Sequence, residues 1–248
     1  MNRITPEEVK TSFREEAAVS HYEAATINIG LWRSEEAVLR RVFKTDQTLL
    51  ELGCGAGRIA LGMWELGFRG ILGTDLSREM ITAARRLAAK LGYSVPLRVA
   101  DATKLPFEDH MFAGVIFGFN GLMQIPTREL RRKALSEMRR VTESGGHGVF
   151  TTHDRNVGSP AGFWEAEQIR WAQGEQDARL NEFGDRITAS DHGDIFIHIP
   201  DRQEIIEDLK ASGWTILEDA MRSEIQTEPD DVREFSVDCR FWVVENPR

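Results

Sequence analysis

The segment at residues 49–58 constrains the fold more than any other part of the chain. It reads Leu-Leu-Glu-Leu-Gly-Cys-Gly-Ala-Gly-Arg, an apolar run with one acid, followed by three alternating glycines and then a helical pattern. Glycines permit positive φ and lack the Cβ atoms that would keep a ligand away from the backbone. The free N–H groups at the start of the next helix would face that ligand. The segment therefore predicts a buried parallel strand that leads into a helix through a ligand-binding turn.

Strand and helix patterns alternate from residue 48 onward. This alternation predicts a parallel sheet with helices on both faces. We expect strands at residues 48–51, 70–75, 97–100, 112–117 and 148–152, and helices at residues 58–66, 77–90 and 127–141. Two helices precede the first strand as an N-terminal extension: one follows the Thr5-Pro6-Glu7-Glu8 capping box as far as about Tyr22, and one spans residues 34–43 with Ser34 as its cap.

The alternation stops after the fifth strand. Residues 154–199 read as an insertion over the C-terminal edge of the sheet, with a helix at 162–173 and an antiparallel hairpin of 186–189 and 194–199 around Asp191-His192-Gly193. A helix at 201–211 and strands at 214–217 and 235–244 complete the chain. We expect one domain over residues 1–248, divided into the extension (1–46), a cofactor-binding core (47–153), a lid (154–199) and a C-terminal part (200–248).

Three acids follow or close the first three strands. Glu51, Asp75 and Asp101 would lie at the carboxyl ends of adjacent strands, where ligands bind in open parallel sheets. Asp75 could accept hydrogen bonds from vicinal ribose hydroxyls, Asp101 could accept one from an exocyclic amine of adenine, and Glu51 would attract an ammonium group and repel a diphosphate. The glycine spacing is G-x-G-x-G, which differs from the G-x-G-x-x-G of dinucleotide folds. The pattern favours a nucleoside that carries a cationic tail.

With these acids the sequence resembles the class I S-adenosylmethionine-dependent methyltransferases. The resemblance rests on Leu50-Glu51-Leu52-Gly53-Cys54-Gly55-Ala56-Gly57, Gly73-Thr74-Asp75-Leu76-Ser77 with Met80, Ala100-Asp101-Ala102, and the turn from Arg140-Val141 to Gly145-Gly146. That turn departs from the family pattern, because Glu143 and Ser144 replace a lysine and a proline. The resemblance implies an α/β fold with a doubly wound, seven-stranded, mostly parallel sheet whose last strand is antiparallel and comes from a C-terminal hairpin.

The resemblance also implies S-adenosylmethionine as cofactor, S-adenosylhomocysteine as product, and a set of binding residues. It places Glu51, Gly53 and Gly55 at the methionine moiety, Asp75 at the ribose, Leu76 and Met80 on the adenine, Asp101 and Ala102 at the adenine edge, and Phe119 beneath the cofactor near the acceptor. Tyr22 and Trp32 of the extension are expected to join this site.

The acceptor side carries weaker signals. Residues 117–122 lack the D/N-P-P-Y/F motif of adenine and glutamine amino methylases, and no cysteine follows the fourth strand to attack a pyrimidine. His153 is the candidate general base, or else a histidine hydrogen-bonded locally at a strand end; Asn120 would orient an acceptor or serve a structural turn. Aromatic and histidine side chains of the extension and insertion would cover the site and shape an organic acceptor pocket, or pack in the core: Tyr22, Trp32, Trp164, Trp171 and His198.

Charge and composition exclude several partners. The formal net charge of −9 argues against nucleic acid and anionic membranes, and we interpret the basic residues between Arg128 and Arg140 as a solvated helix face. No apolar run approaches the roughly 20 residues that span a bilayer. Two cysteines are too few for a disulfide framework or a zinc site, and the histidine spacings predict no metal, so a cytoplasmic location is expected.

We therefore expect transfer of a methyl group to an N or O nucleophile of a small molecule. Three alternatives remain open: a tRNA or protein methyltransferase, a non-catalytic module that binds S-adenosylmethionine, and a nicotinamide-dependent oxidoreductase. The glycine spacing and Glu51 argue against the last of these.

Overall fold

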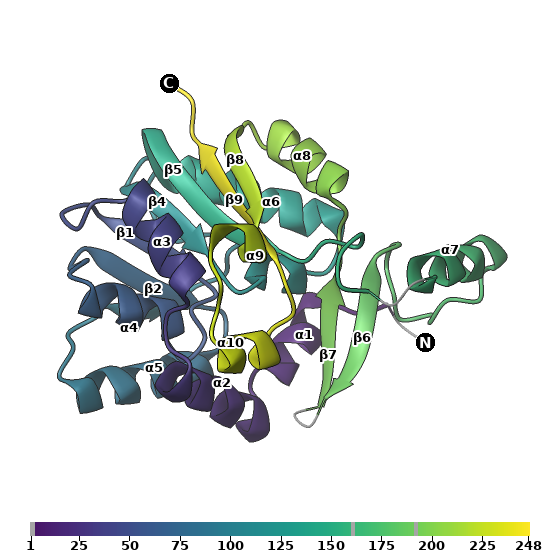
Figure 1. The fold of residues 1–248 in the computed structure, drawn as a ribbon, viewed down its shortest axis with the longest axis horizontal. Helices are drawn as coiled ribbons and strands as arrows, with labels where there is room; N and C mark the ends of the chain where they lie inside the picture. Colours follow the sequence, from purple (N-terminus) through teal and green to yellow (C-terminus); the bar gives the residue numbers. More distant parts are fainter. Residues whose placement is uncertain (1–2, 160–161, 191–192) are drawn as a thin grey trace.

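The computed structural model describes residues 3–159, 162–190 and 193–248, and its centre is a seven-stranded sheet (Figure 1). The strand order is β3-β2-β1-β4-β5-β9-β8. The first five strands in this order are parallel, and β9 runs antiparallel to both of its neighbours, β5 and β8. The bounds are Leu49–Leu52 for β1, Ile71–Asp75 for β2, Leu97–Val99 for β3, Phe112–Phe117 for β4, Thr142–Thr152 for β5, Thr215–Met221 for β8 and Arg240–Glu245 for β9. The predicted fold class is confirmed.

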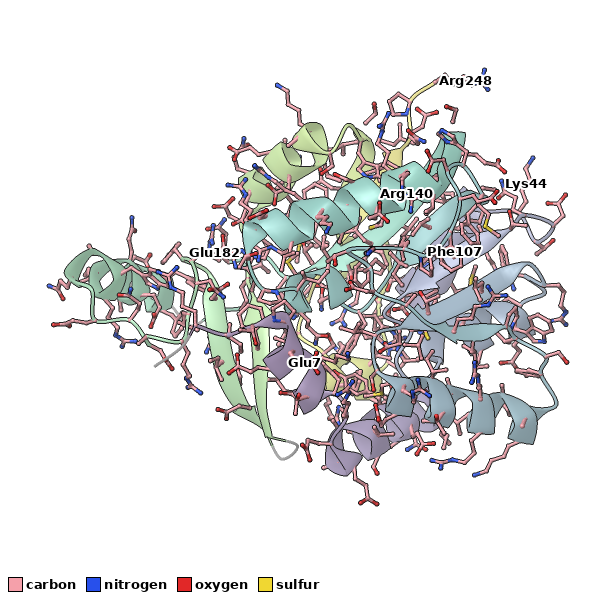
Figure 2. The ribbon with its side chains drawn as sticks, turned by 180° about the vertical axis from the view of Figure 1, so that it is seen from behind. Glu7, Lys44, Phe107, Arg140, Glu182 and Arg248 are labelled. Carbon is pink, nitrogen blue, oxygen red and sulfur yellow. The ribbon has the colours of Figure 1, made fainter. Side chains whose placement is uncertain are left out.

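Helices cover both faces of the sheet because successive side chains of each strand point in opposite directions. Leu49 packs toward α3 (Arg33–Val42), α4 (Arg58–Glu65) and α5 (Arg78–Leu91), whereas Leu50 packs toward α6 (Arg128–Val141) and α8 (Arg202–Ala211). The view from behind shows α6 and α8 lying across the second face (Figure 2). Hydroxyls of Ser77 and Thr127 accept the capping N–H groups of α5 and α6, as their sequence positions predict.

The N-terminal extension contains three helices in the described residues. The capping box of Thr5 begins α1 (Pro6–Ser12), but the predicted helix to Tyr22 is wrong, because a turn separates α1 from α2 (Glu16–Asn28). Ser34 is not the cap of α3. The carboxylate of Glu228 takes that role instead, since it accepts the backbone N–H groups of Arg33 at 3.1 Å and Ser34 at 2.8 Å.

The insertion lies to one side of the sheet. It contains α7 (Phe163–Gln173) and the antiparallel hairpin of β6 (Asp185–Ser190) and β7 (Gly193–His198); residues 191 and 192 of the predicted turn fall outside the described part. Strand β7 packs against α1 and the short 3₁₀ helix η1 (Gly121–Gln124) that follows β4. Helix α7 lies beyond the hairpin, far from the sheet, and contributes no buried residue (Figure 1). The prediction that the whole insertion covers the sheet edge is therefore wrong for α7.

A long connection joins β8 and β9. It contains α9 (Arg222–Ile225) and α10 (Asp230–Phe235), so the predicted strand at 235–244 is wrong over its first half, and the two strands do not form a tight hairpin. Pro229 precedes α10, and Asp230 and Asp231 occupy its first turn, an arrangement that favours a helix start. Over the residues that the structure describes, no helix has the length and apolar character needed to cross a membrane. The division of the domain into four parts stays a prediction.

Candidate functional site

A cleft opens at the C-terminal ends of β1, β2 and β4. It encloses about 1120 Å³ of empty space, part of it open to solvent. The glycine turn, the residues after β2, β3 and β4, the first two helices and α10 form its walls. All the predicted cofactor residues except Trp32 line it: Tyr22, Glu51, Gly53, Gly55, Asp75, Leu76, Met80, Asp101, Ala102 and Phe119.

The glycine turn places backbone against the cleft. Gly53 and Gly55 adopt φ values of +61° and +54°, a region that disfavours side chains with a Cβ. A Cβ on Gly53 would also lie 2.9 Å from Cε2 of Phe117. Gly57, with φ of +95°, is the N-cap of α4. The turn thus needs glycine for its own conformation as well as for the approach of a ligand.

Asp75 anchors the turn from the end of β2. Its Oδ2 accepts the N–H of Gly55 at 2.9 Å, and its Oδ1 accepts the N–H of Ser77 at 2.8 Å. Burial raises the pKa of Asp75, and these backbone N–H groups oppose the increase. The carboxylate therefore fixes the cleft wall and faces the cleft at the same time.

Asp101 is oriented by its own turn. The backbone N–H and the hydroxyl of Thr103 both donate to Oδ1 of Asp101 at 2.8 Å. Asp101 also lines the cleft. A carboxylate fixed in this way can accept a hydrogen bond with little loss of side-chain entropy.

Glu51 is the most unusual polar group of the cleft. Its side chain is 2 % exposed, and Oε2 has no hydrogen-bond partner among the described residues. Burial raises its pKa to about 8, although the nearby Arg58 guanidinium acts in the opposite direction. A buried carboxylate oxygen without a partner is costly unless a ligand supplies one.

Arg58 forms the floor beside Glu51. Its guanidinium donates to both carboxylate oxygens of Glu35, at 2.5 and 2.6 Å, and to the carbonyl of Gly30 at 2.9 Å. Trp32 lies beneath this pair, with the Arg58 guanidinium 4.7 Å from its ring. The expectation that Trp32 reaches the cleft is wrong, because its indole is 1 % exposed and is packed against Arg58 and Phe119.

The segment after β4 is strained. Phe119 and Asn120 have φ values of +47° and +59°, a backbone conformation that residues other than glycine rarely adopt. The hydroxyl of Thr151 accepts the N–H of Asn120 at 2.9 Å and holds this turn. Phe119 faces the cleft, whereas Asn120 is buried behind it, with Nδ2 3.2 Å from Nε2 of His153.

His153 and Asn120, the predicted catalytic residues, do not line the cleft. Burial lowers the pKa of His153, which keeps its imidazole neutral. Because Asn120 and the strained turn separate it from the cleft, the geometry does not support His153 as a base that touches an acceptor.

An aromatic cover, formed by Phe13, Tyr22, Phe119 and Phe235, lines one side of the cleft. The Phe119 and Phe235 rings stack at 5.1 Å, Tyr22 meets Phe119 edge-on at 6.2 Å, and the rings of Tyr22 and Phe13 lie 6.0 Å apart at an angle of 49°. Several lining residues are not among those predicted from sequence: Val9, Lys10, Phe13, Gln124 and Phe235. Val9 and Phe13 lie on the apolar face of the predicted first helix, so they could have been identified from sequence. Phe235 could not, because its segment was predicted to be a strand.

The insertion aromatics lie elsewhere. Trp164 and Trp171 meet Phe183 edge-on, at 5.8 and 6.3 Å, and neither lines the cleft. His198 is fully buried between carboxylates of the hairpin and α8. Of the two predicted alternatives, an acceptor pocket or the core, His198 takes the core. Trp164 and Trp171 do not shape the pocket, because α7 lies beyond the hairpin, far from the sheet.

Comparison with known proteins agrees with the motifs. A family model described as a methyltransferase domain matches residues 49–146. Demethylmenaquinone methyltransferase of Bacteroides fragilis is 33% identical over 139 residues, which cover 52% of this chain and 55% of that protein. A ubiquinone/menaquinone biosynthesis C-methyltransferase of Coxiella burnetii is 30% identical over 139 residues and 54% of each chain. Residues 49–146 are therefore similar to methyltransferase domains.

Solved structures share the fold of this chain. An S-adenosylmethionine-dependent methyltransferase from Methanosarcina mazei has a TM-score of 0.65 and 18% identity, over 85% of this chain and 97% of the other. The [4+2]-cyclase SpnF has a TM-score of 0.70 and 18% identity, over 100% of this chain and 98% of the other. Since a cyclase shares the fold, fold alone does not decide the reaction. The chain also spans only about half the length of the curated relatives it matches.

The cleft fits the family cofactor, S-adenosylmethionine, on one decisive feature. Once ionised, the unpartnered carboxylate of Glu51 suits a cation and would repel a phosphate, and S-adenosylmethionine ends in an ammonium group. A buried, partly apolar cleft with a few fixed acids is also the usual form of a nucleoside site.

Proposed function

We propose that this protein transfers a methyl group from S-adenosylmethionine to a small organic molecule. The observation that carries the proposal is the buried, unpartnered oxygen of Glu51, which faces a cleft formed by family motifs. Sequence relatives named as methyltransferases support the same reaction, although each matches over only part of its length.

The binding roles follow from the positions of the acids. Glu51 would hold the ammonium group, Asp75 the ribose hydroxyls and Asp101 the adenine amine. Leu76, Met80 and Ala102 line the intervening wall and would pack on the adenine. When bound, the cofactor supplies a methyl group activated by a positively charged sulfur.

The chain itself mainly positions the reactants. Phe119 and Phe235 form a flat apolar wall near the end of β4, and Tyr22 lies close to Gln124 beside it. Such a wall excludes water and orients a planar acceptor. Orientation alone can supply roughly 7–11 kcal/mol of the barrier. We assign His153 and Asn120 to the support of the Phe119 turn rather than to proton transfer.

The acceptor atom has two candidates. The sequence favours nitrogen or oxygen, whereas the Coxiella burnetii relative is named a C-methyltransferase, which favours an activated carbon. An aromatic acceptor would suit the Phe119–Phe235 wall with either kind of atom. Nuclear magnetic resonance of the methylated product distinguishes C-, N- and O-methyl groups by chemical shift.

The charge distribution disfavours nucleic acid as the acceptor. The basic cluster of α6 is largely paired with acids: Arg128 and Arg132 both donate to Asp208 at 2.7 Å, and Arg140 donates to Glu137 and Asp109 at 2.8 Å. Figure 2 shows Arg140 on α6, on the face of the sheet covered by α6 and α8. Paired guanidiniums offer little to a phosphate backbone.

An acceptor screen with methyl-labelled S-adenosylmethionine tests the proposal. We expect label in small aromatic molecules with the wild-type protein and none with Asp75→Ala. Label found only in tRNA or protein fractions would contradict the small-molecule acceptor. Tight cofactor binding with no transfer in any fraction would instead identify a non-catalytic binding module.

A further inference from the structure

A buried histidine lies outside the cleft, between two carboxylates. His198, at the end of β7, is fully buried; its Nδ1 lies 2.8 Å from Oδ1 of Asp185, and its Nε2 lies 2.8 Å from Oε1 of Glu204. A neutral imidazole has only one N–H, whereas an imidazolium has two. The two carboxylate contacts are therefore both complete only when His198 is charged.

Other charged groups surround His198 on every side. Arg131 of α6 contacts Glu182 at 3.1 Å and Glu204 at 3.3 Å, and Arg155 contacts Asp201 at 2.7 Å and Glu204 at 3.5 Å. Four carboxylates (Asp185, Glu182, Asp201 and Glu204) thus face two guanidiniums, which favours a positive charge on the histidine. Burial lowers the pKa of His198, but the hydrogen bonds to Asp185 and Glu204 outweigh burial and raise it.

These contacts join separate elements. Asp185 belongs to β6, His198 to β7, Glu204 to α8 and Arg131 to α6, and Figure 2 shows Glu182 where the hairpin meets α6. The packing there leaves no space, since a Cβ on Gly184 would lie 2.8 Å from Cε1 of His198. Glu182, Asp185 and His198 offer ligand atoms within 4.8 Å of one another, but His198 pairs with Asp185 and Glu182 pairs with Arg131, so we interpret the cluster as an ion-pair network.

The hairpin fixed by this unit contacts two walls of the cleft. Strand β7 packs on η1 and α1. The segment before β6 also holds the N-terminus, because the N–H of Ile4 donates to the carbonyl of Arg179 at 2.8 Å and the side chain of Asn181 donates to the carbonyl of Ile4 at 3.1 Å. Helix α1 contributes Val9 and Lys10 to the cleft, and η1 contributes Gln124.

We propose that the His198–Asp185–Glu204 unit is a positioning device that fixes the β6–β7 hairpin on the core and thereby holds α1 over the cleft. His198 acts through the hairpin and touches no cleft ligand. Weakening the unit should release α1 while leaving the sheet intact.

Hydrogen–deuterium exchange of the full chain tests this proposal without any ligand, so its outcome does not depend on the proposed methyl transfer. In His198→Gln, the amides of α1 and the hairpin should exchange about tenfold faster, while those of α5 stay unchanged. The matched control is His147→Gln in β5, which should leave α1 unchanged. Faster exchange confined to the hairpin, or the same change in the control, would overturn the proposal.

A pH series of the wild-type protein separates positioning from general loss of structure. After correction for intrinsic exchange, protection of α1 should be complete below pH 6.5 and should decrease as pH rises through the higher pKa of the folded state. His198→Gln should show no such step. A step of equal size in the variant, or no step in the wild-type protein, would contradict the role of His198.

Discussion

Different kinds of contact stabilise the two sides of the cleft. On the strand side, Asp75 bonds to Gly55 and Ser77, which are 20 and 2 residues away. On the covering side, Glu228 caps a helix 194 residues earlier in the chain, and Phe235 stacks on Phe119. The strand side is therefore determined by local backbone requirements, whereas the cover exists only once distant segments have met.

The two sides meet at Ser77. Its hydroxyl accepts the capping N–H of Met80 at 3.2 Å and donates to the carbonyl of Phe13 at 3.1 Å. One residue thus begins a helix of the core and ties the cover to the end of β2. Because this contact joins them, variants that affect one side and spare the other measure how independent the two sides are.

Asp75→Ala should have the largest effect, and it acts on the strand side. Loss of charge-assisted hydrogen bonds worth about 1.5–3 kcal/mol should weaken S-adenosylmethionine binding roughly 10- to 150-fold in calorimetry. Asp75→Asn keeps one acceptor oxygen and should fall between the wild-type protein and Asp75→Ala. The exposed Asp46, away from the cleft, provides the control as Asp46→Ala. Equal affinities in all four proteins would show that Asp75 serves only the turn.

Glu51→Gln should have the next largest effect, with a dependence on pH. The pKa of Glu51 is raised to about 8 by burial, so the free protein holds a proton at pH 7 that an ammonium ligand would displace. Wild-type affinity should rise from pH 6 to pH 8, and the variant should be about tenfold weaker at pH 8 but close to wild type at pH 6. Calorimetry in buffers of different ionisation enthalpy should detect proton release in the wild-type protein alone.

The same carboxyl group makes a prediction for stability. Its folded-state pKa of about 8 lies above the ordinary value of 4.5, so between these pH values the folded chain holds a proton that the unfolded chain has lost. The free energy of unfolding should therefore decrease as pH rises from 4.5 to 8. Glu51→Gln should remove this part of the pH dependence in denaturant titrations.

Glu228→Ala should have the smallest effect, and it acts on the covering side. Loss of the cap on α3 should cost about 1 kcal/mol and lower the melting temperature by about 2–4 °C. Cofactor affinity should stay within about twofold of wild type, since Glu228 lies outside the cleft. Glu234→Ala, on the exposed face of α10, should change neither quantity. A large loss of cofactor affinity in Glu228→Ala would show that the two sides are strongly coupled.

Prediction from sequence succeeded where the local backbone conformation requires a particular type of residue. Gly53 and Gly55 are needed for positive φ, Ser77 caps its own helix, and strand periodicity located β1, β2 and β4. These features were enough for the sheet and for the acids of the cleft. The antiparallel strand β9 followed from the family resemblance.

The covering side of the cleft could not be predicted from the sequence in the same way. Phe235 reaches the cleft because a helix interrupts the β8–β9 connection, and apolar spacing near residue 235 does not distinguish that helix from a strand. Trp32 was expected at the cleft, and His198 either there or in the core. Both instead contact distant charged residues: Arg58 lies over the indole of Trp32, and Asp185 and Glu204 flank the imidazole of His198. Such partners are visible only in three dimensions.

Above all, we propose that the cleft selects a nucleoside with a cationic tail. Calorimetric titration of the wild-type protein with S-adenosylmethionine, S-adenosylhomocysteine and NAD tests it most directly. At a pH above the Glu51 pKa of about 8, we predict saturable binding of the first two and none of NAD, because the ionised, unpartnered carboxylate repels a diphosphate. Binding of NAD without binding of S-adenosylmethionine would contradict the account.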